Sequence, residues 1–483
     1  MEDSAAVLDE IVSDVMERTG ISGVAVGIVA EDQVVLTEGW GVREEGKPDT
    51  VDDETVFQLA SLSKPLSSTV VAGLVGEGAL DWDTPVSEID PDIELSDPWV
   101  SEHVTVEDLY AHRSGLPGNA GNDLEVFGYD QATILERLRY LPLDPFRATY
   151  HYSNFGMTAG GVAAATAAGT TLPDAADDLL FGPAGMDSTS FRNADLLAEE
   201  NRASLHAKVG DGFEPNFVRQ PDAQAPAGGA SSNVEDLSTW MRLQLADGSL
   251  DGEQLIDADA LARAHTAHMN TAAGQDPPPD PARKPGLYGL GFNVGTDDFG
   301  QGNVVWGHSG AFTHGAGTTV RLIPELGLGV IVLTNAAPVG GAEAIAEGYI
   351  DRLLNGPSER DWTATWTERF APLLQVPPIP EPADPVEAEP ATAYVGTYRN
   401  DYFGEVRVIE QGGVLVMQVG PALGQSYDLE HYDANTFLYV DSPEVEGART
   451  PLEFEVGSNG SATALVLGEV ATAESWNTLS RAG

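Results

Sequence analysis

The sequence predicts an α+β fold followed by a small all-β domain. Apolar residues recur at spacings of three and four over 5–18, which predicts an amphipathic helix, and two β-rich runs follow at 23–29 and 34–37. Strand-like runs return near residue 288 after a mostly helical stretch. Beyond residue 392 the apolar period changes to two, which is typical of a β-meander.

The domain organisation follows from length and composition. With 483 residues and 42% hydrophobic content, the chain can bury more than one core. A stretch rich in Pro, Glu and Ala at 376–392 is typical of a linker. We therefore expect a first domain over 1–375 and a β-domain over 393–483.

The charge balance is strongly acidic. Asp and Glu number 76 against 24 Lys and Arg, a formal net charge of -52 that is spread along the whole chain. Nucleic acid and anionic membranes would be repelled, so neither is an expected partner. Such a surface is typical of proteins from salt-loving organisms, in which concentrated cations screen the self-repulsion. Disorder is the alternative, but the regular apolar patterning argues against it.

Cysteine is absent, which excludes disulfides and thiolate metal sites. The N-terminus, Met1-Glu2-Asp3-Ser4, has no basic region followed by an apolar stretch, and no run approaches membrane-spanning length. We expect a cytoplasmic location, unless a leader has been removed.

The most informative stretch is Ser61-Leu62-Ser63-Lys64. An apolar run, Val56 to Ala60, leads into it, and helical spacing continues to Gly76. Residues three apart share a helix face, so the Ser61 hydroxyl and the Lys64 amine would project together at a helix N-terminus, as an activated nucleophile requires. Lysine occurs only four times in the chain. The plain alternative is that Ser61 is an ordinary N-cap.

A second motif is a weaker match. Gly41 to Lys47 spells G-x-x-x-x-G-K, as in a phosphate-binding loop. However, Pro48 stands where Ser or Thr should bind magnesium, and Glu44 and Glu45 would repel phosphate. A loop that connects strands is the better interpretation.

The middle of the chain is mostly helical in pattern. The polar patch His151-Tyr152-Ser153-Asn154 precedes a Gly/Ala-rich helix, and we expect Tyr152 and Asn154 to lie just outside that helix. Helices are predicted over 105–113, 132–140, 155–169 and 234–245.

Strand patterns dominate the next stretch. A surface loop is predicted over 270–285, which is rich in Pro, Asp and Ala. Gly307 to Phe312, including His308-Ser309-Gly310, looks like a hairpin connection with a polar tip. Strands are predicted over 288–294, 302–306, 317–323 and 327–334.

Several catalytic signatures are missing. The sequence has no G-x-S-x-G elbow, which argues against a typical α/β-hydrolase. It also lacks H-E-x-x-H, and its nine histidines are scattered, which argues against zinc. We expect neither a metal nor a cofactor.

Three patches remain, namely Ser61-x-x-Lys64, Tyr152-Ser153-Asn154 and His308-Ser309-Gly310. In this order and at these separations they resemble the motifs S-x-x-K, Y-x-N and K/H-[ST]-G of serine hydrolases related to class C β-lactamases and D,D-peptidases. The flanking stretches 109–117, 226–230 and 288–292 are similar to this family as well.

This resemblance covers about residues 5–370. It implies an antiparallel sheet flanked by helices, with a mostly helical subdomain. The C-terminal region resembles the lipocalin-like β-barrel that some members carry.

The resemblance also implies roles for the site residues. Ser61 would form an acyl-enzyme, and its own N–H and that of Ala311 would form an oxyanion hole. Lys64, as a cation, would lower the pKa of the hydroxyls of Ser61 and Tyr152. Tyr152 would shuttle the proton, and Asn154 would orient Lys64 and the substrate amide.

His308 departs from the commonest pattern, which has lysine. Histidine is mostly neutral at pH 7 and suits a substrate carboxylate less well. An esterase or a D-amino-acid-directed peptidase acting on a small ester, amide or short peptide is therefore favoured over a β-lactamase or D,D-carboxypeptidase. An inactive binding protein on the same fold and an unrelated structural protein are further alternatives, and a homo-oligomer is possible.

Overall fold

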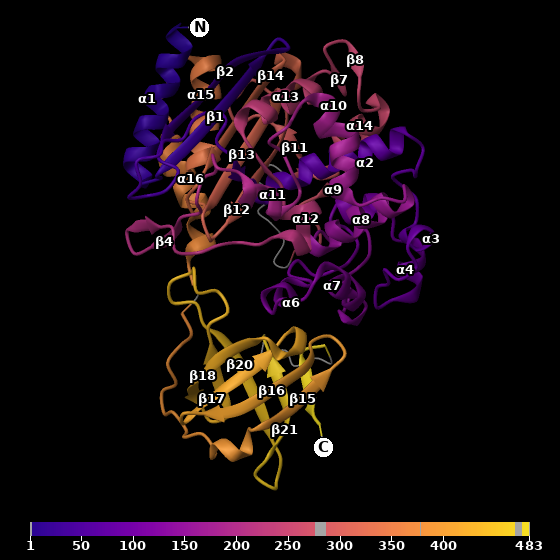
Figure 1. Ribbon diagram of the computed structural model, residues 1–483, viewed down its shortest axis with the longest axis vertical. Coiled ribbons are helices and arrows are strands. Elements are labelled where there is room, and N and C mark those ends of the chain that lie inside the picture. The colour runs from indigo at the N-terminus through magenta and orange to yellow at the C-terminus, as the bar shows by residue number, and fades with distance from the viewer. Residues whose placement is uncertain (1, 276–285, 377, 469–475, 483) are drawn as a thin grey trace.

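In the computed structural model the chain forms a large α+β body with a small barrel below it (Figure 1). The central sheet of the body has eight strands in the order β2-β1-β14-β13-β12-β11-β10-β9, with antiparallel pairing throughout. The predicted α+β class with a C-terminal all-β barrel is confirmed. The structure describes residues 2–275, 286–376, 378–468 and 476–482.

The strands of the central sheet are β1 (Gly23–Ala30), β2 (Gln33–Gly41), β9 (Met269–Asn270), β10 (Leu287–Tyr288), β11 (Asn293–Thr296), β12 (Val304–Phe312), β13 (Ala316–Ile323) and β14 (Leu328–Thr334). Three short pairs lie outside it: β3 (Phe57–Gln58) with β6 (Ser231–Ser232), β4 (Ala207–Val209) with β5 (Gly212–Glu214), and β7 (Ser249–Leu250) with β8 (Glu253–Gln254).

Helices cover both faces of this sheet. On one face α15 (Gly341–Asn355) packs on β13 and β14, and α1 (Glu2–Thr19) and α16 (Trp362–Phe370) pack on α15. On the other face α13 (Val234–Leu245) packs on β1 and β14. This arrangement explains why β14 is buried at every position instead of alternating.

The remaining helices form the region beside β12 on the right of Figure 1. They are α2 (Ser63–Gly76), α3 (Val86–Ile89), α4 (Pro98–His103), α5 (Val106–Tyr110), α6 (Asn122–Val126), α7 (Gln131–Arg137), α8 (Asn154–Ala167), α9 (Leu172–Ala176), α10 (Gly182–Ala184), α11 (Asn193–Ala198), α12 (Ala225–Gly228) and α14 (Ala258–Ala264).

Two strand predictions were wrong. The stretch Gly307 to Phe312 is no hairpin connection but the second half of β12, and the turn follows it at residues 313–315. The expected strand over 288–294 is split into β10 and β11, because residues 289–292 leave the sheet.

Other differences concern the end of the body. Helices α15 and α16 were not predicted from the sequence. Of the loop predicted over 270–285, residues 276–285 lie outside the described residues.

The C-terminal part is a closed eight-stranded antiparallel barrel. Residues Tyr394, Tyr398, Phe437 and Phe454 are buried and their rings contact one another at centroid distances between 4.7 and 5.7 Å. These packed side chains form the core of the barrel. Its strands are β15 (Gly396–Asn400), β16 (Gly404–Gln411), β17 (Val414–Val419), β18 (Gln425–Asp433), β19 (Thr436–Tyr439), β20 (Thr450–Val456), β21 (Ala462–Leu467) and β22 (Thr478–Arg481).

The barrel contacts the body near α6, at the turn after β12, and at the turn between β4 and β5, where the Gly210 N–H donates to Glu446 at 3.1 Å. Near α6, the Tyr402 hydroxyl donates to the Asp123 carboxylate at 2.6 Å, and the Tyr129 hydroxyl donates to the Phe403 carbonyl at 2.6 Å. At the turn after β12, the Thr313 hydroxyl donates to Glu444 of the barrel at 2.9 Å. The barrel thus holds both the helical region and the tip of a central strand.

Candidate active site

Ser61 lies in a single 3-10 turn, Ala60–Leu62, directly before α2. It is partly exposed, whereas both its neighbours are buried. Ala60 has a φ of 49°, a left-handed value that costs energy for a residue other than glycine. The N-cap of α2 is Leu62, and no side chain caps the helix, so the N-cap alternative for Ser61 was wrong.

Lys64 is fully buried in the first turn of α2. Its Nζ lies 3.0 Å from the Ser61 Oγ, 2.8 Å from the Asn154 Oδ1 and 2.8 Å from the Ala227 carbonyl oxygen. These partners are all uncharged. Burial without a carboxylate partner lowers the pKa of Lys64 well below its ordinary value, which favours a neutral amine.

Tyr152 packs beside this amine, with the Lys64 Nζ 4.5 Å from the centre of its ring. Burial raises the pKa of the Tyr152 hydroxyl well above its usual range, while a hydrogen bond with Ser61 acts in the opposite direction. Burial therefore outweighs any lowering of the Tyr152 pKa by Lys64, and the expected effect of Lys64 stays a prediction. Burial acts in this direction because a phenolate loses its hydration in the interior.

Asn154 is the first residue of α8, and the Ser153 side chain caps that helix by accepting from the Gly156 N–H at 3.1 Å. The expectation that Asn154 lies outside the helix was wrong by one residue. Because Asn154 lies in the first turn of α8, the helix fixes its backbone, and its side-chain amide oxygen accepts a hydrogen bond from the Lys64 Nζ.

His308 is 3% exposed in β12. Its Nδ1 donates to the Ser309 carbonyl oxygen at 2.7 Å, so its Nε2 accepts from the Tyr288 hydroxyl at 3.0 Å. Burial, with the nearby Lys64 as a lesser cause, lowers the pKa of His308 to about 3. A neutral histidine with both nitrogens occupied offers no cation to a substrate carboxylate.

Ala311 is placed by the crossing of β12 and the Ser61 turn. A Cβ added at Gly310 would lie 2.1 Å from the Leu59 carbonyl oxygen, so only glycine permits this approach. Pairing of β12 with β11 ends at Gly307, which leaves residues 308–312 unpaired on that side among the described strands. The main chain of Ala311 therefore lies beside the Ser61 turn at a strand edge.

The structure thus gathers the candidate residues to different degrees. Ser61, Lys64 and Asn154 are directly hydrogen-bonded, and Tyr152 packs on them. His308 is farther out, since its ring centre lies 6.1 Å from that of Tyr152 and it is bonded to another tyrosine.

Sequence reasoning gave no role to three residues that hold the site. The Ala227 carbonyl and the Tyr288 hydroxyl are described above. The third is His112, whose Nδ1 accepts from the Ser153 N–H at 3.2 Å while its carbonyl oxygen accepts from the His151 N–H at 3.0 Å. His112 therefore fixes the backbone on either side of Tyr152. All three lie in stretches that the resemblance had picked out, which was the available signal.

Two features are absent from the described residues. No group of three or more His, Asp or Glu side chains there could hold a metal ion. Nor does any helix within the described ranges have the length and apolar character needed to cross a membrane.

Comparison with known families gives two matches. The family described as Beta-lactamase matches residues 8–354. A Domain of unknown function (DUF3471) matches residues 380–478, which include the barrel strands β15 to β21.

Similar proteins are known from fungi, bacteria and an archaeon. An unguisins hydrolase of Aspergillus violaceofuscus is 27% identical over 93% of this chain and 85% of its own length. Another unguisins hydrolase, from Aspergillus campestris, is 27% identical over 84% of this chain and 79% of its own length. Protein flp of Staphylococcus aureus is 23% identical over 50% of this chain and 49% of its own length.

A solved structure shares the fold across both parts. The octameric penicillin-binding protein homologue from Pyrococcus abyssi superposes with a TM-score of 0.62 at 20% identity, covering 98% of this chain and 99% of that chain. The predicted β-lactamase/transpeptidase-like fold is confirmed.

Proposed function

The chain belongs to the beta-lactamase family and is a serine hydrolase of the esterase or peptidase type, and we propose that it acts through an acyl-enzyme on Ser61. The observation that carries this proposal is the buried, uncompensated Lys64 amine, 3.0 Å from the Ser61 hydroxyl. A neutral amine at that distance can accept the serine proton as the oxygen attacks a carbonyl carbon.

In the proposed acylation, the proton of Ser61 is passed through Lys64 and Tyr152 to the leaving group. The Ser61 oxygen bonds to the substrate carbon while its proton passes to the Lys64 nitrogen. The carbonyl oxygen becomes an oxyanion, which the N–H groups of Ser61 and Ala311 stabilise. Tyr152 gives its proton to the leaving oxygen or nitrogen and regains one from Lys64. Water then attacks the ester on Ser61 along the reverse route, releasing the acid.

Within this class we propose esters and short D-amino-acid peptides as substrates, in preference to β-lactams or D,D-peptides with a recognised carboxylate. His308 supports this preference, because its ring is neutral and both of its nitrogens are already hydrogen-bonded, so it offers no cation to a substrate carboxylate. The two fungal relatives are named unguisins hydrolases, which supports hydrolysis as the reaction.

The test is a comparison of wild type with Ser61→Ala in molar KCl. We expect wild type to hydrolyse p-nitrophenyl esters and Ser61→Ala to lose that activity, with Ser63→Ala as the control because Ser63 bonds only to the backbone of Ala60 and Ala230. Full activity in Ser61→Ala would remove Ser61 from the mechanism. A panel of esters, nitrocefin and D- and L-amino-acid peptides would then rank the substrates. Preference for nitrocefin would overturn the ester and peptide assignment.

We also propose that the chain forms a homo-oligomer and is located in the cytoplasm. The octameric state named for the Pyrococcus homologue supports the first point. Sedimentation velocity in molar KCl tests it, and a single species of one-chain mass would refute it.

A further inference from the structure

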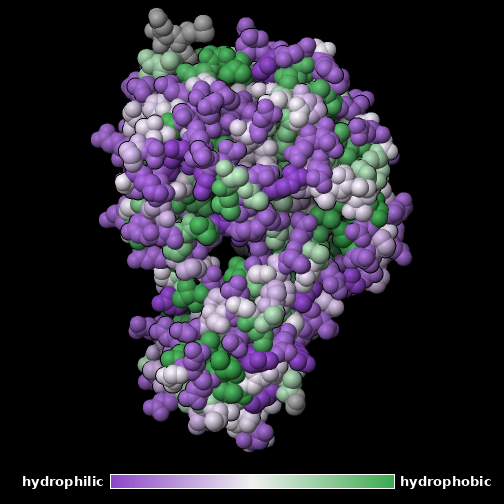
Figure 2. All heavy atoms as spheres, in the orientation of Figure 1, coloured by the Kyte–Doolittle hydropathy of each residue, from purple (hydrophilic) through white to green (hydrophobic). Residues whose placement is uncertain are grey.

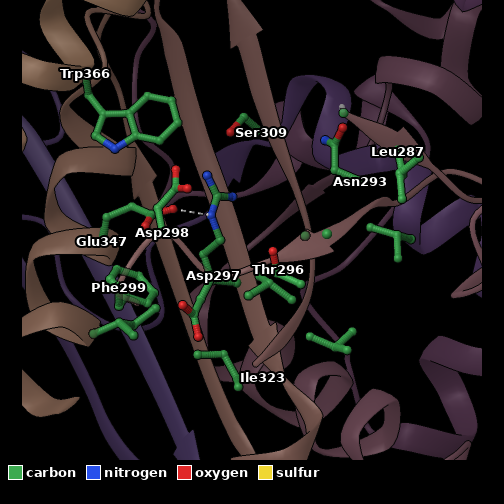
Figure 3. A pocket seen from close by; sticks show the side chains of 18 of the residues that line it. Leu287, Asn293, Thr296, Asp297, Asp298, Phe299, Ser309, Ile323, Glu347 and Trp366 are labelled. Atoms are coloured by element: carbon green, nitrogen blue, oxygen red, sulfur yellow. Dashed lines mark hydrogen bonds and ion pairs between the residues drawn. The ribbon is translucent and has the colours of Figure 1, made fainter. Parts of the chain in front are cut away.

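The end of β12 that carries Ala311 is held by a partner strand on one edge only. Residues 308–312 pair with β13, but the pairing with β11 stops at Gly307. The strand is not packed solidly on all sides either, because Gly307 and Ser309 line a cavity of about 870 Å³ (Figure 3). The position of Ala311 therefore depends in part on what fixes the turn that follows the strand, residues 313–315.

The barrel supplies one of the contacts at this turn. Its loop between β19 and β20 places Glu444 beside Thr313, whose hydroxyl donates to the Glu444 Oε1 at 2.9 Å. The Nδ1 of His314 lies 3.6 Å from the same oxygen, which is too long for a hydrogen bond. On the body side, a Cβ added at Gly315 would lie 2.0 Å from the His206 nitrogen. The turn is thus held by the body at one end and by the barrel at the other.

Glu444 is an unusual residue to find at such a contact, because it is an acid that is only 7% exposed. In the described part of the chain, no lysine or arginine lies within ion-pair distance of it, and the Thr313 hydroxyl is its one hydrogen-bond donor. A buried carboxylate loses its hydration, and hydrogen bonds compensate for that loss. Bonds to a carboxylate are also stronger than those between neutral groups. The contact between Glu444 and Thr313 is therefore a firm one.

The path from this contact to the candidate active site is short. Only Phe312 separates Thr313 from Ala311. The Phe312 ring packs beside Gly228, where an added Cβ would lie 3.5 Å from it, and the residue before Gly228 supplies the carbonyl oxygen that binds the Lys64 amine. A shift of the turn would thus be felt at the oxyanion hole, where a displacement of about 1 Å can cost about a hundredfold in rate.

We propose that Glu444 is a positioning residue for the hydrolysis, which holds Thr313 and thereby places the Ala311 N–H where the oxyanion forms. This inference rests on the proposed function, in which Ser61 is the nucleophile. It gives the barrel a role in catalysis that needs no contact between the barrel and the substrate.

The test combines ester kinetics with the binding of phenylboronic acid, both on the full chain in molar KCl. In the boronate complex, boron bonds to the Ser61 oxygen, the serine proton passes to Lys64, and a boron-bound hydroxyl occupies the oxyanion position. The affinity for this compound therefore reports on the oxyanion hole. Glu444→Ala should lower kcat/KM about tenfold, within the loss that displacement of a positioned group causes, and should weaken boronate binding by the same factor.

Two variants separate this role from a general effect of the barrel loop. Glu446→Ala is the matched control, because Glu446 lies in the same loop but accepts from the Gly210 N–H at the turn between β4 and β5. Its kcat/KM and boronate affinity should equal those of wild type. Glu444→Gln keeps an oxygen that can accept from Thr313, and should restore most of what Glu444→Ala loses.

Thr313→Val removes the donor from the other side of the contact and should cause the same loss as Glu444→Ala. Because both changes break one bond, the double variant should lose no more than either single variant. Circular dichroism checks folding, and Thr313→Val decides alone if Glu444→Ala does not fold. Unchanged boronate affinity in these variants, or equal losses in Glu444→Ala and Glu446→Ala, would overturn the proposal. A folded wild type without ester hydrolysis would instead overturn the proposed function.

Discussion

Among the single residues, Lys64 is the proposed base, and its burial favours the neutral amine that can accept a proton. Its side chain is fully buried, and its three polar partners are a hydroxyl, an amide oxygen and a backbone carbonyl. None of these can balance an ammonium charge, so desolvation dominates and the neutral amine is favoured.

The pH dependence of the rate follows from this shift. The amine accepts a proton only when neutral, so kcat/KM should rise with pH through the lowered pKa of Lys64 and reach its plateau well below the pH at which an ordinary lysine deprotonates. A pH–rate profile with a neutral ester in molar KCl measures this. A rate that climbs only in the range of an unperturbed lysine would contradict the burial argument.

Removing the amine gives a second prediction. Lys64→Met keeps a linear apolar side chain in the buried space and should lower kcat by at least about a hundredfold, the lower range for a lost general base. Lys208→Met is the matched control, because the Lys208 amine donates to the Asp211 carbonyl and lies 4.6 Å from the centre of the Phe213 ring, neither of which belongs to the site. Steady-state kinetics on both variants provides the measurement, and near-normal kcat in Lys64→Met would refute the role.

The sequence predicted the side chains of the site better than their environment. Spacing picked out Ser61 and Lys64, and the family resemblance added Tyr152 and Asn154, and the structure brings these four together. The Ala227 carbonyl could not be predicted, because a backbone oxygen has no residue signature. The direction of the Tyr152 pKa depends on burial, which spacing does not reveal.

At the scale of elements, the site depends on how closely β12 crosses the turn before α2. Gly310 allows the contact with Leu59, and the Thr318 hydroxyl of β13 donates to the same Leu59 carbonyl at 2.8 Å. The glycine that permits this approach and the serine before it are also residue types typical of turns. That is why the sequence pattern predicted a hairpin connection over 307–312 where a strand exists.

A methyl group at this crossing should therefore disrupt the site. Gly310→Ala would put a Cβ 2.1 Å from the Leu59 oxygen, forcing β12 away from Ser61, and we expect a stability loss of about 1–3 kcal/mol and a larger relative loss of kcat/KM. Gly295→Ala in β11 is the control, because an added Cβ there meets nothing within 4 Å. Thermal unfolding and ester kinetics on both variants test this. Equal activity of the two variants would contradict the crossing argument.

At the scale of the whole molecule, the acidic surface and the two-part architecture stand out. Figure 2 shows hydrophilic residues over most of the visible face of both parts. The barrel is joined to the body by a hydrogen bond that Tyr402 donates to Asp123 and one that Glu444 accepts from Thr313, partners that no sequence pattern indicates. The alternating pattern predicted the barrel, but only the structure shows where it contacts the body.

A net charge of -52 should make folding depend on salt. Like charges repel across the compact chain, and dissolved ions screen that repulsion, so the thermal midpoint should rise as KCl increases from millimolar to molar. Circular dichroism melts at a series of KCl concentrations measure the effect, with sucrose as a control that stabilises without screening charge. A midpoint independent of KCl would contradict this account of the surface.

The central claim is that Ser61 is the nucleophile of a serine hydrolase, and covalent labelling tests it most directly. The folded chain, in molar KCl, is treated with a fluorophosphonate, digested and analysed by mass spectrometry. The account predicts one adduct, on the peptide that contains Ser61, and none in Ser61→Ala. An adduct on another serine, or no adduct on a chain that circular dichroism shows to be folded, would contradict it.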